Sequence, residues 1–439
     1  MAGDGPTQDV LVLGAGAAGL WCAEVAARGG RDVLVLEKVS RTGTKVLASG
    51  GSRCNLTTTL GPMEAAKLFG ARGERFLRAG FQALPPAEVR ARFEGWGVAT
   101  EEAPLEKIFP ASGNARDVRD ALEGAARGAG ARIQLDAGAV AVERDGDLWL
   151  VRSADGATVR ARALVLAVGG MSYPGTGTTG DGYPWLEALG LEVVTPVPAL
   201  VPLSSPAPWV HELTGIAWQG AEVRLEDAQG RTLQRRARPV LFTHRGLSGP
   251  GAMDVSHHVA RHAAAGAPTG SGGGAPSDTA APTLRVDFFP DLDREALRGE
   301  LVSAAGRPGA PRLQRALGDL ATGPMPRRLF DALAGATGLA PDVTVNGLDR
   351  SSRHGLVETM KGLEVPVDGT TGWDQAEVTA GGLSLREVSP RTMAVNRCPG
   401  LFVIGELLDL NGPIGGLSFQ AAFATAQLAG EALAGEAPD

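Results

Sequence analysis

The sequence predicts an α/β fold whose main domain is a parallel sheet covered by helices, with further strands inserted into it. Three observations predict this fold. Near the start, an apolar run over residues 10–13 leads directly into three closely spaced glycines. Near the end, a second apolar run over residues 401–404 leads into Gly405 and Glu406. Between residues 196 and 372 the composition changes to clustered prolines and short strands. Strand–turn–helix units at both ends indicate one domain built from both ends of the chain.

The glycines in DVLVLGAGAAGL have the spacing of a dinucleotide-binding turn. Gly14 allows a tight turn, Gly16 lets the backbone approach a pyrophosphate, and Gly19 lets the helix pack closely on the strand. The start of the helix offers free N–H groups and a partial positive charge to phosphate. A second strand over 32–36 ends on Glu37, which is placed to accept a ribose hydroxyl. This stretch therefore predicts a Rossmann-like dinucleotide-binding unit.

The loop over residues 38–57 is dense in small, polar and basic residues. It suits a cofactor that lies extended across the domain and needs backbone donors along its length; the alternative is a flexible surface loop. In the first interpretation Lys45 could neutralise phosphate charge. We interpret Cys54 as a small packing residue rather than a redox partner. The inner half of the ligand would be contacted by Ser49, Gly50, Gly51, Arg53 and Asn55.

After this loop the pattern predicts helices over 62–100 and 114–127, followed by strands. Three alternating segments separated by RDGD and ADGA turns predict an antiparallel meander, which is typical of FAD-type rather than NAD-type domains. A continuous apolar run over 162–168 predicts a buried strand that ends at Gly169 and Gly170. The other predicted strands are 132–135, which is parallel, and the meander strands 140–143, 148–152 and 158–161.

The segment GGMSYPGTGTTGDGY follows the buried strand. Its two leading glycines let the backbone reach a cofactor a second time. Asp181 precedes a predicted helix, and two roles are open for it: an N-cap or a site residue.

The middle of the chain predicts a small β-barrel or sheet inserted into the dinucleotide domain. His244 lies in a Gly/Ser-rich turn, where a structural role and a role in substrate binding or proton transfer are both open. Asp254, His258 and His262 share one face of a predicted helix, but we expect no metal site there. The predicted strands are 216–218, 221–225, 232–236 and 239–242, and Ser248-Gly-Pro is a predicted helix start.

The low-complexity segment 263–283 predicts a mobile loop. Helical patterns over 293–304, 311–320 and 326–334 predict a small helical subdomain, and a returning strand pair is predicted over 356–360 and 363–367. The expected domains are an FAD-type domain over 1–195 and 373–439, a barrel over 196–290 and 350–372, and a helical subdomain over 291–349.

The last block of the sequence carries a second acidic strand end and a second glycine-opened helix. Glu406 could accept hydrogen bonds from ribityl hydroxyls. The helix N-terminus at 416–418 could stabilise negative charge on a reduced isoalloxazine ring. Two such ends that serve one ligand require a long, two-ended cofactor, which indicates FAD. The ring face could be lined by Thr379, Gly381 and Gly382.

Composition narrows the class of protein. The formal net charge of -7 and the scattered basic residues predict no nucleic-acid partner. The first residues do not read as a signal peptide, and no charge-free apolar run has membrane-spanning length. Three widely spaced cysteines without a CxxC suit a reducing compartment. We therefore expect a cytoplasmic protein with no membrane partner, either a monomer or a homodimer.

Six stretches in a fixed order span nearly the whole chain: GAGAAGL, GTKVLASGGSRCNLT, GGMSYPGTGTTGDGY, FTHRGLSGP, EVTAGGL, and PGLFVIGELLD with GPIGGLSFQAAFATAQLAG. Together they resemble the BaiN-like (YhiN-like) family of FAD-dependent flavoproteins, and more distantly the fumarate reductase and glutathione-reductase-type flavoproteins. The resemblance implies a glutathione-reductase-type, Rossmann-like FAD-binding domain with an inserted β-barrel and a small helical subdomain. It also implies oxidoreductase activity, with reduction of activated C=C bonds suggested for a bile-acid-processing member. This sequence departs at Leu417, where an aromatic residue is common, and in the extra 263–283 segment.

Motifs and resemblance together predict a non-covalently bound FAD that exchanges hydride at N5 with a small organic substrate, held between the flavin and the inserted domain. His244 and Arg53 are candidates to donate a proton or to anchor a carboxylate. Only one GxGxxG, at residues 14–19, directly follows a predicted strand, so NAD(P)H, if it is the donor, would visit the flavin transiently. The residues expected to contact FAD are Gly14, Gly16, Ala17, Ala18, Gly19, Glu37, Lys38, Gly43, Lys45, Ser49, Gly50, Gly51, Arg53, Cys54, Asn55, Val140, Ala167, Gly169, Gly170, Gly405, Glu406, Gly415, Gly416, Leu417 and Ser418.

Two alternatives stay open at this point. The first is a flavin-dependent oxidase or an RNA-modifying flavoprotein, although the acidic net charge does not favour RNA. The second is a non-catalytic FAD-binding redox scaffold.

Overall fold

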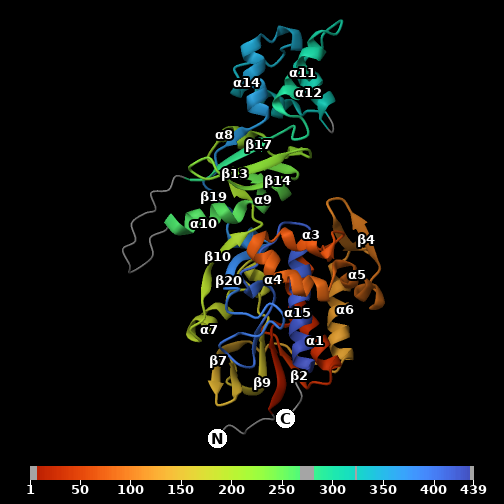
Figure 1. Ribbon diagram of the computed structural model, residues 1–439, viewed down its shortest axis with the longest axis vertical. Helices are drawn as coiled ribbons and strands as arrows, with labels where there is room; N and C mark the ends of the chain where they lie inside the picture. The colour runs from red at the N-terminus through yellow and green to blue at the C-terminus, as the bar shows by residue number, and fades with distance from the viewer. Residues whose placement is uncertain (1–6, 267–280, 322–323, 436–439) are drawn as a thin grey trace. The chain divides into compact units, whose positions relative to one another are not determined.

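The computed structural model describes residues 7–266, 281–321 and 324–435, so most of the predicted loop over 263–283 lies outside the described residues. The chain forms two compact units. The first unit consists of Met1–Val197 and Glu377–Asp439, and the second of Pro198–Ala376 (Figure 1). The first unit is thus assembled from both ends of the chain.

A seven-stranded sheet forms the centre of the first unit. Its order is β6-β2-β1-β9-β8-β7, and β21 also pairs with β9. Strands β6, β2, β1, β9 and β21 run parallel, while β7, β8 and β9 form the predicted antiparallel meander. The bounds are β1 (Gln8–Leu13), β2 (Val33–Leu36), β6 (Arg132–Gln134), β7 (Ala139–Asp145), β8 (Leu148–Ser153), β9 (Thr158–Leu166) and β21 (Leu401–Val403).

Strand β9 corrects the prediction of two separate strands over 158–161 and 162–168. It is one continuous strand, Thr158–Leu166, because no turn-forming residue interrupts it. Its first part pairs with β8, and the rest pairs with β1 on one side. Its last three residues, Leu164 to Leu166, also pair with β21, so this strand joins the two ends of the chain.

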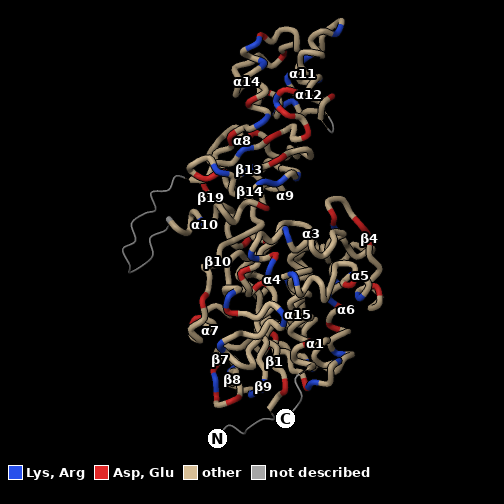
Figure 2. The backbone as a smooth tube through the Cα atoms, in the orientation of Figure 1, with Lys and Arg blue, Asp and Glu red and all other residues tan. Residues whose placement is uncertain are grey.

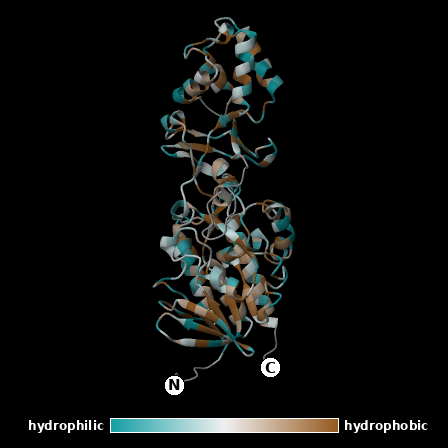
Figure 3. Ribbon diagram, turned by 90° about the vertical axis from the view of Figure 1, so that its left-hand side faces the viewer, coloured by the Kyte–Doolittle hydropathy of each residue, from teal (hydrophilic) through white to brown (hydrophobic). Residues whose placement is uncertain are grey.

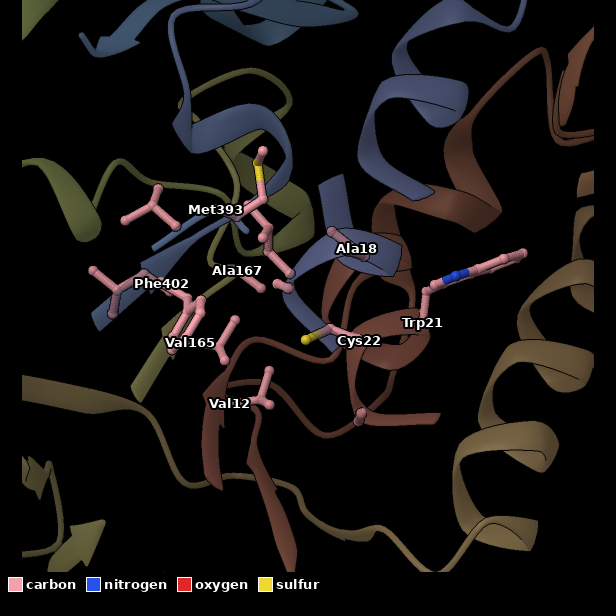
Figure 4. Close-up of a cluster of buried hydrophobic side chains, with 14 of the residues drawn as sticks. Val12, Ala18, Trp21, Cys22, Val165, Ala167, Met393 and Phe402 are labelled. Carbon is pink, nitrogen blue, oxygen red and sulfur yellow. The ribbon is translucent and has the colours of Figure 1, made fainter. Parts of the chain in front are cut away.

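The buried strands form the core together with the helices that cover the sheet. Val12 of β1 and Phe402 of β21 both stand opposite Val165 of β9 (Figure 4). Cys22 and Trp21 are fully buried in the same core. The central strands β1, β9 (in its second half) and β21 carry continuous buried apolar runs, and the sheet is largely brown in Figure 3, as is expected where both faces of a parallel sheet are covered.

Helices α1 (Ala17–Arg28) and α15 (Leu417–Gly435) pack directly on each other. The indole N–H of Trp21 donates to Gln427 at 2.9 Å. A Cβ added to Gly430 would lie 2.6 Å from the Val25 side chain, so glycine permits this close approach. The other elements of this unit are α2 (Thr44–Ala48), α3 (Pro62–Lys67), α4 (Gly70–Ala83), α5 (Pro86–Gly95), α6 (Ala115–Gly128), α7 (Gly182–Ala188), β3 (Thr57–Thr58), β4 (Thr100–Ala103), β5 (Lys107–Pro110), β10 (Val193–Ala199), β20 (Val378–Leu383), and the 3-10 turns η1 (Pro174–Thr176) and η4 (Gly405–Leu407).

In the second unit the predicted barrel takes the form of two sheets, ordered β12-β15-β16-β11-β19 and β14-β13-β17-β18. Phe242 of the first sheet and Val223 and Val286 of the second belong to one buried apolar cluster. The strands are β11 (Leu203–Ser204), β12 (Ala217–Trp218), β13 (Glu222–Glu226), β14 (Thr232–Ala237), β15 (Val240–Thr243), β16 (Gly246–Ser248), β17 (Thr283–Asp287), β18 (Leu363–Val365) and β19 (Gly369–Thr370).

The helical part of the second unit differs from prediction at one element. Residues 356–360, predicted as a strand, belong to helix α14 (Arg350–Met360). Asp349 caps this helix by accepting from the Ser352 N–H at 2.7 Å, and Leu356 and Met360 bury one helical face. The other helices are α8 (Pro208–Glu212), α9 (Gly249–Asp254), α10 (Ser256–Gly266), α11 (Arg294–Ala305), α12 (Leu313–Leu320), α13 (Arg327–Ala336), and the 3-10 turns η2 (Val345–Gly347) and η3 (Trp373–Gln375).

The helix predicted to carry Asp254, His258 and His262 on one face is broken at Val255, between α9 and α10. Asp254 is buried and forms an ion pair with Arg236 at 2.7 Å. Asp254 therefore does not share a helix with His258 and His262, which both lie in α10 at the predicted spacing of four residues. Across residues 7–266, 281–321 and 324–435, every helix is too short or too polar to span a bilayer.

Candidate cofactor-binding site

The three glycines of the first turn have three different surroundings. Gly14 has φ +100°, and a Cβ there would lie 2.5 Å from the carbonyl oxygen of Ala167. A Cβ on Gly19 would lie 1.9 Å from the Gly14 carbonyl oxygen. A Cβ on Gly16 would meet no atom within 4 Å. Gly14 and Gly19 are therefore required by the backbone, whereas Gly16 leaves open space at the N-terminus of α1, where Ala17 and Ala18 begin the helix.

Glu37 follows β2 and reaches back to this turn. Its carboxylate accepts from the backbone N–H of Ala15 at 2.7 Å and of Val39 at 3.1 Å. It lines a pocket at the carboxyl ends of β1 and β2 together with Gly14 and Trp185. Trp185 was missed by the sequence analysis, because nothing around it in the sequence marks it as a site residue.

Asp181 stands at the N-cap position of α7 but makes no side-chain capping bond. Its carboxylate instead accepts from Lys38, in an ion pair, and from the Thr179 hydroxyl at 2.7 Å. Lys38 and Asp181 both line the pocket beside Glu37. The side chain of Asp181 therefore does not cap α7, and its role as a site residue stays a prediction.

The loop after β2 is held against the first turn. The Gly43 N–H donates to the Ala15 carbonyl at 2.9 Å. Gly50 and Gly51 have φ +55° and +66°, and Cys54 has φ +60°. Cys54 is fully buried, and burial raises the pKa of its thiol to about 12. A thiol that stays protonated is a poor nucleophile, which agrees with the packing interpretation.

Asn55 connects this loop to the start of α15. With its amide oriented to satisfy both ends, it accepts from the Gly416 N–H at 2.7 Å and donates to the carbonyls of Thr57 (3.2 Å) and Ile108 (3.3 Å). Its side chain is thus used in joining distant segments. Ser49 likewise turns inward, and its hydroxyl donates to the Val46 carbonyl at 2.7 Å.

Lys45 and Glu406 form an ion pair at 2.6 Å, with side chains 25% and 21% exposed. Glu406 also accepts from the Ser172 hydroxyl at 2.7 Å and from the Thr379 backbone N–H at 3.0 Å. The phenol of Tyr183 lies near Glu406. Burial is the main cause that raises the pKa of this phenol, and the negative charge of Glu406 raises it further. Ser172 was not singled out from the sequence.

Glycines make room for the group of side chains formed by Lys45, Ser172, Thr379 and Glu406. A Cβ on Gly170 would lie 2.2 Å from the Thr379 hydroxyl oxygen, and one on Gly405 would lie 3.0 Å from the Ala18 Cβ. Gly169 has φ +75°. Gly381 and Gly382, expected at the ring face, are instead pressed against backbone, each with an added Cβ 2.4 Å from a carbonyl oxygen.

The first turn of α15 resembles that of α1. A Cβ on Gly415 would meet no atom within 4 Å, whereas one on Gly416 would lie 2.2 Å from the Thr57 carbonyl oxygen. Leu417 is buried in the core, and Ser418 is half-buried.

Three further predicted residues have exposed side chains. The Arg53 guanidinium is exposed and stacks over the Phe109 ring, 4.3 Å from its centroid. Val140 is 55% exposed at a bulge in β7. His244 is exposed in the turn between β15 and β16 and belongs to the second unit.

The first unit fits an elongated dinucleotide. Open space lies at Gly16 and Gly415, each at the start of a helix whose first N–H groups can bind negative charge. The pocket lined by Glu37 lies at the carboxyl ends of β1 and β2. Glu406, which is paired with Lys45, follows β21. FAD has phosphates, hydroxyls and an electron-accepting ring that match these features.

Comparison with known proteins agrees with this geometry. The family model described as HI0933-like protein Rossmann domain matches residues 8–432. The ribosomal RNA dihydrouridine synthase of Escherichia coli (strain K12) is 29% identical over 427 residues, covering 95% of this chain and 96% of that protein. The 3-dehydro-bile acid delta(4,6)-reductase of Clostridium scindens is 29% identical over 426 residues, covering 96% and 98%.

Among solved structures, the 3-ketosteroid-delta4-(5alpha)-dehydrogenase of Rhodococcus jostii RHA1 is matched with a TM-score of 0.47 at 15% identity, covering 99% of this chain and 98% of that chain. A flavocytochrome c3 fumarate reductase is matched with a TM-score of 0.46 at 15% identity, covering 99% and 79%.

The family model spans nearly the whole chain, and the sheet order and glycine turn are those of a Rossmann-type domain. The chain therefore belongs to the HI0933-like family, which confirms the family predicted from its motifs, and it is an FAD-dependent oxidoreductase with a Rossmann-type α/β fold.

Proposed function

We propose that this protein uses bound FAD to reduce a carbon–carbon double bond that is conjugated to a carbonyl group. The reactions for which two relatives are named support this proposal. Dihydrouridine is uridine with its ring C=C saturated, and the double bonds of a 3-dehydro-delta(4,6) acid are conjugated to a ketone. When bound and reduced by an electron donor, the flavin would supply a hydride to the electron-poor carbon of such a substrate and return to its oxidised form.

In this proposal the chain's own residues hold the cofactor. Gly16 admits the pyrophosphate to the N-terminus of α1, and Glu37 accepts a ribose hydroxyl. Glu406 accepts a hydroxyl of the ribityl chain, and the start of α15 at Gly415 stabilises negative charge on the reduced ring. The other glycines and loop residues expected to contact FAD would hold these groups in position.

Hydride addition leaves negative charge on the substrate carbonyl oxygen and requires a proton at the neighbouring carbon. Arg53 is the proposed anchor for that oxygen, because guanidinium stays charged and carries several N–H donors. His244 is the proposed proton donor, because imidazole exchanges protons near neutral pH. Replacing His244 with Gln should lower kcat while leaving hydride transfer from NAD(P)H to FAD unchanged in stopped-flow traces.

Two substrate classes satisfy the same chemistry. Our sequence-based expectation is a free small molecule, such as an enone, and the acidic net charge and the interspersed charges in Figure 2 support it. The second candidate is a uridine in ribosomal RNA. It is favoured by two relatives named as ribosomal RNA dihydrouridine synthases, from Escherichia coli and Haemophilus influenzae.

The test is to load the purified protein with FAD, reduce it anaerobically, and mix it with each substrate. A steroid dienone and deproteinised ribosomal RNA are the two probes, and flavin reoxidation is followed by its absorbance. Reoxidation by RNA, with dihydrouridine found by mass spectrometry, selects the second candidate. A protein that retains no FAD, or a flavin that neither probe reoxidises, rules out the proposed reaction for these substrates and favours an oxidase or a scaffold.

The electron donor is tested in the same apparatus. We propose NAD(P)H, which would visit the flavin transiently because only the GxGxxG at residues 14–19 directly follows a strand. Bleaching of the flavin by NADH or NADPH supports this, and bleaching by neither assigns the donor to another reductant. A cytoplasmic location, where both donors occur, is part of the proposal and is supported by three free cysteines.

A further inference from the structure

The ion pair between Lys45 and Glu406 joins residues 361 positions apart in the sequence. Lys45 lies in the short helix α2, and Glu406 lies in the turn after β21. The Lys45 ammonium also donates to the Ser172 hydroxyl at 2.5 Å, and that hydroxyl donates to Glu406 at 2.7 Å. Both charges are three-quarters or more buried, so the pair is screened less than a surface ion pair.

Both oxygens of the Glu406 carboxylate accept hydrogen bonds from protein groups, and the carboxylate can accept one more. One oxygen accepts from Ser172 and from the Thr379 N–H, and the other accepts from Lys45. A carboxylate offers about four acceptor positions. One position on the Lys45-bound oxygen therefore remains for a hydroxyl of a ligand.

The pair has no net charge, and this matters for a redox cofactor. Opposite charges 2.6 Å apart largely cancel at the distance of a neighbouring ring, whereas either charge alone does not. Nearby protein charge is one of the ways in which a protein tunes flavin electronics.

We propose that Lys45 is a positioning residue that neutralises and orients Glu406, so that FAD binds beside a neutral ion pair. Loss of the Lys45 charge and loss of the Glu406 charge then shift the flavin reduction potential in opposite directions. This inference rests on the proposed role of the first unit in binding FAD. Lys45 then does not contact phosphate, which changes the role expected from its place in a glycine-rich loop.

The test compares Lys45→Met, Glu406→Gln and the double variant. Lys45→Met leaves an unpaired negative charge, which opposes the gain of electrons, so the potential falls and FAD affinity drops about tenfold or more. Glu406→Gln leaves an unpaired positive charge, so the potential rises. The double variant restores neutrality and should return the potential close to that of the wild type. Potentials are measured against reference dyes and affinity by fluorescence titration.

The matched control is Lys67→Met, at the exposed end of α3. It removes the same charge from a lysine outside the proposed site, and its potential should stay near that of the wild type. If Lys45→Met does not fold, two other variants still test the inference. Lys45→Arg keeps the positive charge and should leave the flavin potential unchanged, whereas Glu406→Gln should raise it. Shifts of equal sign in both single variants, or no shift in either, overturn the inference. A wild-type protein that binds no FAD instead overturns the proposed function.

Discussion

Helices α1 and α15 begin alike but are held in place differently. Each has one glycine that faces open space, Gly16 in the first and Gly415 in the second. Each also has a glycine pressed against a carbonyl oxygen. For Gly19 that oxygen belongs to the same turn, whereas for Gly416 it belongs to Thr57, far away in the sequence. The first turn can therefore form from local sequence alone, and the second is defined only when α15 docks on β3.

Gly19→Ala should have the largest effect on stability. The added Cβ would lie 1.9 Å from a backbone oxygen that cannot move without opening the turn. We expect a loss of more than about 3 kcal/mol in the free energy of unfolding, seen as poor yield or a much lower Tm. Gly124→Ala in α6 is the control, because a Cβ there meets no atom within 4 Å and alanine favours a helix. A Gly19→Ala protein as stable as the control would contradict the local origin of the turn.

Gly416→Ala should be next, at about 2–3 kcal/mol. It combines φ +78° with a Cβ 2.2 Å from the Thr57 carbonyl oxygen. Gly415→Ala has φ +151° and no close atom, so it should cost only about 1 kcal/mol. Chemical denaturation of both variants gives the comparison. Equal losses would mean that strain in φ, not docking on β3, defines the start of α15.

Asn55→Ala should cost about 1–3 kcal/mol, because it removes the amide that joins Gly416, Thr57 and Ile108. Asn55→Asp keeps the acceptor for the Gly416 N–H and adds negative charge at a helix start, so it should recover part of that loss. The measurement is the midpoint of denaturation. If Asn55→Asp is less stable than Asn55→Ala, the hydrogen bond to Gly416 is not the main contribution of Asn55 to stability.

Gly16→Ala should leave the fold nearly unchanged, within about 0.5 kcal/mol, because the new methyl group meets no protein atom. The same methyl group should occupy the space proposed for the pyrophosphate and weaken FAD binding at least about tenfold. Fluorescence titration with FAD checks the affinity, and a thermal melt without FAD checks the fold. Normal affinity in a folded variant would remove Gly16 from the site.

Buried thiols give the smallest and most local readout. Cys22 lies in α1, and Cys54 precedes Asn55, which bonds to the start of α15. Burial raises the pKa of each thiol to about 12, so at pH 8 both should resist alkylation in the folded protein. Cys398, which is only partly buried, serves as the reactive reference. If Cys54 is alkylated before Cys22 under mild denaturation, the α15 end opens first, as the comparison predicts.

Short-range patterns were sufficient for most of the sheet. The runs in β1, β2 and β21 are continuously apolar because both faces are covered, and that property is visible in the sequence. The pattern of apolar residues gave the wrong secondary structure at residues 356–360, where a helix with one buried face was interpreted as a strand. It also failed at β9, because one strand changes partners without any local mark at Ala161.

The candidate site divides in the same way. Gly19 is required by the backbone of its own short turn, whereas Gly14 combines the positive φ of that turn with a close approach to Ala167; the spacing predicted glycine at both positions but not the contact with Ala167. The partners of charged groups were not predictable. Lys45 was expected at phosphate but pairs with Glu406, and Asp181 was expected as a cap or a site residue but pairs with Lys38. Each pairing depends on strands that meet only in the finished sheet.

Strand β9 has a consequence for the newly made chain. Its outer edge at Leu164–Leu166 is completed only by Leu401–Val403, more than 230 residues later in synthesis. Until the ribosome has released that segment, a strand edge of the central sheet is open and the proposed flavin site lacks Glu406. If the proposed site is correct, cofactor loading waits for the last stage of biosynthesis, and a prematurely terminated polypeptide would carry an unpaired strand edge that can pair with other chains.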